Sequence, residues 1–131
     1  MTQVALVRDG DLFRLVLKPP QRDLLDAVLL FIAARGESEA VVTLCTGTSS
    51  RCLADLRGRA ADAHGCLVSL QELHVLHAAL LATKSFFASE EDFFLRIGFF
   101  RENADELARN LVVALDRAGA PPSLTGEDLD M

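Results

Sequence analysis

The sequence predicts an α+β fold. An N-terminal antiparallel sheet (a hairpin plus further strands) with one packed helix is followed by a three-helix C-terminal segment. Near the N-terminus, two apolar, β-favouring runs flank Asp9 and Gly10, a dipeptide suited to the positive φ angles of a tight hairpin turn. From Ser69 onwards, apolar residues recur at helical spacing between start and stop signals. Strands followed by helices is the element order typical of an α+β domain.

The first predicted helix spans residues 21–35 and follows the strands of the hairpin. Pro19 and Pro20 can open it, because proline has no N–H to lose in a first helical turn. Gly36 is a natural C-terminal stop. Apolar residues cover most of the circumference of this helix, so we expect it to be buried against the sheet.

The middle of the chain is the least readable part. Residues 39–46, EAVVTLCT, are rich in β-branched residues and are predicted to form a third strand. Residues 51–70 fit two structures. The runs RCLADLR and CLVSL can pair as strands, or Ser49 or Ser50 can cap a helix. We favour strands.

Three polar residues at the starts of the C-terminal helices each precede an acidic residue by three positions, the spacing of a capping box. These pairs are Ser69 with Glu72, Ser89 with Asp92, and Asn103 with Glu106. The middle helix is short and ends at Gly98. We predict a single domain over residues 1–118. If the chain subdivides, it does so near residue 65, into a sheet part, 1–68, and a helical part, 69–118. Residues 119–131 are predicted to be a disordered acidic tail.

Charge and hydropathy disfavour several classes of partner. The 131 residues carry a net charge of −6, which repels nucleic acid and anionic membranes. The longest apolar run, residues 24–34, is too short to span a bilayer. The N-terminus lacks the pattern of a secretory signal. We therefore expect a cytoplasmic protein without membrane association, for which nucleic acid is an unlikely partner.

Metal and catalytic chemistry have weak support. The candidate metal ligands are His64, Cys66, His74 and His77, of which the last two are three residues apart on a predicted helix. Their spacing matches no closed zinc pattern, and a histidine on a leucine-rich face more often packs than binds metal. Cys52 and His64 could form a nucleophile and base, but no motif connects them. We predict no metal, no cofactor and no catalytic residue.

Six of the eight phenylalanines lie between residues 86 and 100, in three adjacent pairs. Phe93, Phe94 and Ile97 fall within about 100° of one helix face, so both rings of the middle pair are predicted to enter the core. The flanking pairs lie in connecting segments, where burying both rings is harder. An exposed ring there would suit a protein partner or a dimer mate. The predicted interaction residues are Phe86, Phe87, Phe99, Phe100 and Arg101.

Residues 89–115 resemble a helix-turn-helix, because a short helix, a glycine turn and a second helix follow one another. The segment departs from that motif at Phe94, where a small residue usually allows the helices to approach. Glu102, Asp105 and Glu106 also lie on the would-be recognition helix, where carboxylates oppose binding to phosphates. The motif is therefore degenerate.

Residues 69–117, including VSLQELHVLHAALL and EEDFFLRIGFFRENADELARNLVVAL, are similar to the C-terminal helical part of small uncharacterised bacterial proteins. Some of these proteins are thought to have immunity or accessory roles. The resemblance implies a binding protein and transfers no catalytic residue. The sequence thus predicts a small non-enzymatic protein that binds a protein partner or itself. The alternatives are a degenerate helix-turn-helix regulator and a small-molecule- or metal-binding enzyme.

Overall fold

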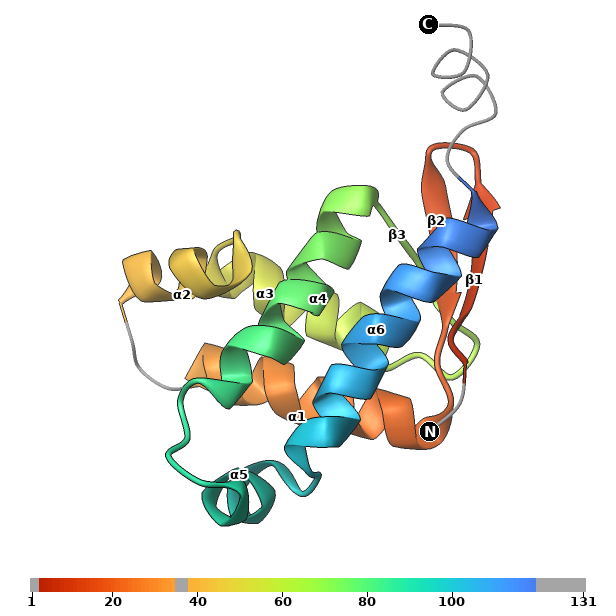
Figure 1. The fold of residues 1–131 in the computed structure, drawn as a ribbon. Helices are drawn as coiled ribbons and strands as arrows, with labels where there is room; N and C mark the ends of the chain where they lie inside the picture. Colours follow the sequence, from red (N-terminus) through yellow and green to blue (C-terminus); the bar gives the residue numbers. More distant parts are fainter. Residues whose placement is uncertain (1–2, 35–37, 120–131) are drawn as a thin grey trace, which may run out of the picture.

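The computed structural model describes residues 3–34 and 38–119, which form a three-stranded antiparallel sheet and six helices (Figure 1). The strands are β1 (Ala5–Asp9), β2 (Leu12–Val16) and β3 (Cys66–Val68), in the order β1-β2-β3. The helices are α1 (Pro19–Ala34), α2 (Glu39–Thr46), α3 (Ser50–Ala60), α4 (Leu70–Lys84), α5 (Glu90–Ile97) and α6 (Arg101–Ala118). The predicted α+β class is confirmed.

The predicted N-terminal hairpin is also confirmed. Leu6 pairs with Leu15, and the turn passes through Gly10 at φ +66°. The other edge of β2 pairs with β3, which brings Phe13 opposite Val68. The sheet is therefore completed by a strand that lies about 50 residues further along the chain.

Residues 39–46 form helix α2, so the prediction of a third strand here is wrong. Ser38 caps the helix, because its side chain accepts a hydrogen bond from the Val41 N–H at 3.3 Å. At the other end the Gly47 N–H donates to the Thr43 carbonyl at 2.7 Å. Two caps, together with packing against α4, outweigh the strand preference of the β-branched residues.

The preference for strands over residues 51–70 is wrong in its first half and right at 66–68. Residues 50–60 form α3, which starts where the Ser49 side chain accepts a hydrogen bond from the Cys52 N–H at 3.2 Å. The apolar side of this helix, carried by Leu53 and Leu56, is buried. An amphipathic helix is thus more favourable here than a strand.

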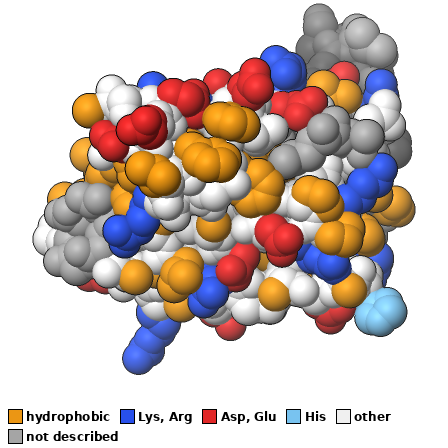
Figure 2. Space-filling model, turned by 90° about the horizontal axis from the view of Figure 1, so that it is seen from below, with side chains coloured by type: hydrophobic (Ala, Val, Ile, Leu, Met, Phe, Trp, Pro, Cys, Tyr) orange, Lys and Arg blue, Asp and Glu red, His pale blue; other side chains and the backbone are white. Residues whose placement is uncertain are grey.

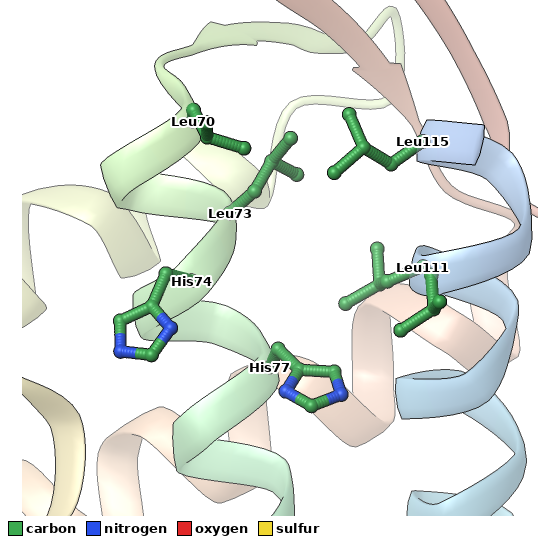
Figure 3. Close-up of a pocket in the computed structure, with 7 residues that line it drawn as sticks. Leu70, Leu73, His74, His77, Leu111 and Leu115 are labelled. Carbon is green, nitrogen blue, oxygen red and sulfur yellow. The ribbon is translucent and has the colours of Figure 1, made fainter. Parts of the chain in front are cut away.

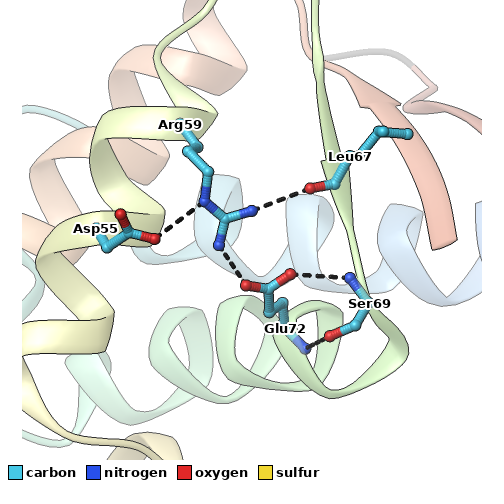
Figure 4. A network of polar contacts seen from close by, with 5 residues as sticks. All are labelled: Asp55, Arg59, Leu67, Ser69 and Glu72. Carbon is cyan, nitrogen blue, oxygen red and sulfur yellow. Dashed lines mark hydrogen bonds and ion pairs between the residues drawn. The ribbon is translucent and has the colours of Figure 1, made fainter.

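A polar network then connects α3 to the start of α4 (Figure 4). Arg59 donates to the carboxylate of Asp55 at 3.1 Å and to the Leu67 carbonyl at 3.0 Å, and it also forms an ion pair with Glu72. Glu72 closes the predicted capping box, since its carboxylate accepts from the Ser69 N–H at 2.9 Å. One guanidinium group therefore holds α3, β3 and α4 together.

Gly65 lies at the entry to β3, where the backbone comes very close to β2. Its φ is +97°, and a Cβ at this position would lie 2.7 Å from the Val16 Cγ2 and 2.8 Å from the Leu15 carbonyl oxygen. Only glycine fits both the positive φ and the space. This residue therefore allows the short strand β3 to pair with the hairpin.

Helix α1 is the centre of the core. Its main neighbours are α3, α4 and α5, so the expectation that it packs chiefly on the sheet is wrong (Figure 1). An ion pair between Arg57 and Asp26, with an N–O distance of 2.8 Å, links it to α3. Helix α6 runs beside α4 and also contacts β1. The buried residues of α1 are Gln21, Leu24, Leu25, Val28, Leu29, Phe31 and Ile32.

The three predicted C-terminal helices are present, and two of their three predicted caps are correct. Ser89 caps α5, accepting from the Asp92 N–H at 3.1 Å. The predicted cap at Asn103 is wrong, because α6 begins at Arg101 and Asn103 lies within its first turn. The Asn103 side chain accepts from the Phe100 N–H at 2.9 Å. This is the hydrogen bond of a capping box in which the third residue of the helix accepts from the N-cap N–H.

Two predictions fall on residues outside the described ranges: the helix stop at Gly36 and, apart from Gly119, the disordered tail over residues 119–131. Within the described ranges, no helix combines the length and the apolar character needed to cross a membrane.

Candidate functional site

The middle phenylalanine pair divides between the core and the surface. Phe93 is 0% exposed and packs edge-to-face on Phe87, with 5.3 Å between ring centroids. Phe94 is 41% exposed and stacks on Phe100 at 4.8 Å. The prediction that both rings enter the core is therefore wrong for Phe94. Consecutive residues differ by about 100° around a helix, and Phe93 and Ile97 define the buried side of α5.

Phe94, Leu95 and Phe100 together form a surface that we call the exposed aromatic patch. Leu95 is 73% exposed and Phe100 is 48% exposed. Seen from below, hydrophobic side chains gather on this side of the molecule next to acidic ones (Figure 2). Leu95 is not among the interaction residues predicted from the sequence, although its position on the helix is a signal for exposure. On a short helix whose Phe93 and Ile97 face inwards, Leu95 must face outwards.

The remaining predicted interaction residues are half-buried. Phe86 and Phe87 pack against Phe31, with ring centroids 5.7 Å and 5.0 Å away. Phe99 also packs against the core. The Arg101 guanidinium donates to the Phe87 carbonyl at 2.7 Å, which fixes the segment before α5 to the start of α6. The three phenylalanines among these residues therefore pack on the core and are not part of the exposed aromatic patch.

Three carboxylates, which we call the acidic rim, lie close to the patch in sequence: Glu91, Asp92 and Glu102. All three are exposed, and within the described part of the chain their carboxylates form no ion pair or hydrogen bond. Glu91 precedes Phe94 by three residues and Leu95 by four, so it shares their face of α5. The patch therefore has a negative border.

Nearby basic side chains are directed elsewhere. Arg96 places its guanidinium over the Phe31 ring, 5.3 Å from the centroid. Arg101 is held by the Phe87 carbonyl, and its backbone N–H donates to Glu90 at 2.9 Å. Neither guanidinium neutralises the acidic rim.

A second feature is a shallow groove of about 190 Å³ between α4 and α6 (Figure 3). Its lining is aliphatic apart from two imidazoles. His77 points towards α6, whereas His74 points to the other side of α4 and lies beside Gly47 (Figure 3). The lining residues are Leu70, Leu73, His74, His77, Leu111, Val112 and Leu115. The groove could accept an apolar side chain but offers no fixed charge to orient a substrate.

The predicted metal candidates are not brought together. Among the described residues, no group of three or more His, Cys, Asp or Glu side chains is arranged to hold a metal. His64 is exposed in the turn before β3, and Cys66 lies within that strand. His74 and His77 point to different sides of α4 (Figure 3).

The cysteines differ in chemical character. Cys52 is exposed near the start of α3. Its thiol has a lowered pKa because of hydrogen bonds with the Ser49 hydroxyl, which has the larger effect, and with the Thr48 hydroxyl. Cys66 is half-buried, and burial raises the pKa of its thiol. Among the residues that the structure describes, no base is hydrogen-bonded to Cys52, so its lowered pKa alone does not make a catalytic site.

Comparison with models of known families, with curated proteins and with solved structures finds no match to this chain. The candidate site is therefore interpreted from its geometry and charge.

Proposed function

We propose that this chain is a small non-enzymatic accessory protein that binds another protein through the exposed aromatic patch. The Phe94–Phe100 stack carries this proposal, because the two phenylalanines pack on each other and are still 41% and 48% exposed as residues. Aromatic side chains are enriched in protein interfaces and provide much of their binding energy. The resemblance of residues 69–117 to accessory-type proteins agrees with this function.

The patch is held in place before any partner arrives. Phe100 is fixed by the hydrogen bond from its N–H to Asn103, and the next residue, Arg101, is fixed by Glu90. Phe94 lies on α5, which is capped by Ser89 at its start and by Gly98 at its end. A preformed surface loses little conformational entropy on binding, which favours affinity.

Site-specific photo-cross-linking in the source cells tests the proposal. A photoreactive amino acid at Leu95 is compared with the same amino acid at Leu44, which is 85% exposed on α2. We expect a discrete cross-linked protein from position 95 and none of the same mass from position 44. Identical products from both positions, or none from position 95, would contradict the proposal.

A degenerate helix-turn-helix regulator is the second proposal, favoured by the arrangement of α5, the Gly98 turn and α6. The exposed Glu102 near the start of α6 opposes it, because a carboxylate there repels the DNA backbone. Gel-shift assays with genomic fragments at low salt separate the two proposals. A shift that weakens steeply with salt would favour the regulator.

A further inference from the structure

We propose that the partner of the exposed aromatic patch is a basic amphipathic segment of a different protein. This inference rests on the proposed function and specifies its partner. Apolar side chains of the segment would cover Phe94, Leu95 and Phe100, and its lysine or arginine side chains would lie against the acidic rim. The charge around the patch, together with the exposure of its rings, leads to this assignment.

The helical spacing places the carboxylate of Glu91 on the same surface of α5 as Phe94 and Leu95. Glu91 lies one turn before Phe94 and Leu95, and Asp92 lies three residues before Leu95. Glu102 follows Phe100 by two residues. A partner cation beside Phe94 would contact the face of an exposed ring and a carboxylate at the same time. The cation–π interaction with the ring and the ion pair with the carboxylate both favour a cationic side chain over a neutral one.

The protein itself leaves this charge uncompensated. Arg96 lies over Phe31, and Arg101 donates to Phe87, so both guanidinium groups are occupied away from the patch. The rim carboxylates form no ion pair within residues 3–34 and 38–119. A binding partner is therefore the source of complementary positive charge.

The same charges argue against a second copy of this chain as the occupant. A symmetric dimer built on the patch would place the patch against itself and the acidic rim against the rim of the other copy. Like charges opposed across an interface are costly. An anionic membrane or a nucleic acid would meet the same repulsion. A basic protein segment fits where these three do not.

Two synthetic helical peptides with the same leucine and phenylalanine pattern test whether the partner segment must carry positive charge. One carries lysine at every polar position and the other carries glutamate. We expect fluorescence anisotropy to show binding of the lysine peptide only, weakened about tenfold between low and high salt. Equal binding of the glutamate peptide would overturn the inference.

Paired charge reversals test whether the peptide binds at the acidic rim. The rim variant Glu91→Lys/Glu102→Lys changes the net charge as much as the control Asp23→Lys/Asp116→Lys, which alters exposed carboxylates on α1 and on the C-terminal part of α6. We expect the rim variant to lose about tenfold or more in affinity for the lysine peptide and the control about twofold. Equal losses would show that only net charge matters, and the inference would be wrong.

The apolar variant Phe94→Ser/Leu95→Ser separates the inference from the proposed function. We expect it to lose the lysine peptide, whereas Leu44→Ser retains it. If binding is unchanged in the apolar variant, both the inference and the assignment of this surface fail. If cross-linking from position 95 succeeds but the captured protein binds without any dependence on the rim, only the inference fails. A homodimer that the apolar variant dissolves, seen by light scattering, would replace the basic segment with a second copy.

Discussion

The neighbouring residues Phe93 and Phe94 allow the placement of the patch to be tested by stability alone. Phe93 is 0% exposed and packs against Phe87 at 5.3 Å, so Phe93→Ala removes a fully buried ring and should cost about 3–5 kcal/mol of unfolding free energy. Phe94 is 41% exposed and stacks on the Phe100 ring. Phe94→Ala should therefore cost about 1 kcal/mol, the contribution of one aromatic pair. The expected difference is about 3 kcal/mol.

Urea unfolding followed by circular dichroism measures both values, with the slope m reporting any change in the surface exposed on unfolding. Leu95→Ala is the control on the same helix and should be close to neutral, since that side chain is 73% exposed. If Phe94→Ala costs as much as Phe93→Ala, then Phe94 is a core residue and the exposed aromatic patch does not exist in solution.

Three further predictions concern the framework. Arg59→Met should cost about 1–2 kcal/mol at neutral pH by removing the partner of Glu72. Burial alone would raise the pKa of Glu72, but hydrogen bonds from Arg59 and the capping serine lower it overall from 4.5. The stability that Glu72 contributes is thus present above pH 4.5 and lost as pH falls through its lower folded pKa. The part of the cost of Arg59→Met that comes from Glu72 is lost with it, whereas the part from the hydrogen bond to the Leu67 carbonyl remains. A cost independent of pH in urea titrations would contradict this. Cys52 should react with iodoacetamide faster than Cys66 at pH 7.5, because its pKa is lowered while burial raises that of Cys66. Equal rates by mass spectrometry would refute the assignment. Gly65→Ala should cost more than about 1 kcal/mol, because it combines a positive φ with a contact of 2.8 Å to a backbone carbonyl. A thermal midpoint like that of the wild type would show that β3 does not enter the sheet here.

The features that the sequence predicted correctly depend on local chemistry. The hairpin follows from Asp9 and Gly10, whose conformational preferences act within four residues. The caps at Ser69 and Ser89 likewise depend on hydrogen bonds that span three residues. Such signals can be read without knowing what packs against the element.

The predictions that are wrong concern features that depend on tertiary contacts. α2 contains β-branched residues that favour a strand, and its packing on α4 is not visible in the sequence. α3 is tied to α4 by Arg59 and Glu72, which are 13 residues apart. The sequence places Phe94 in the core, and the structure exposes it, because the width of the buried face of α5 depends on its neighbours, α1 and α6. Periodicity gives the direction of a face but not how much of it is covered.

The central claim is that the exposed aromatic patch binds a protein. It is tested most directly by the affinity of the protein captured from position 95 for Phe94→Ser/Phe100→Ser, measured beside Leu44→Ser by surface plasmon resonance. Interface aromatic truncations cost more than about 1 kcal/mol each at important positions, so we expect the double variant to bind at least about tenfold more weakly. Leu44→Ser should bind like the wild type. Equal affinities for all three proteins would contradict the claim.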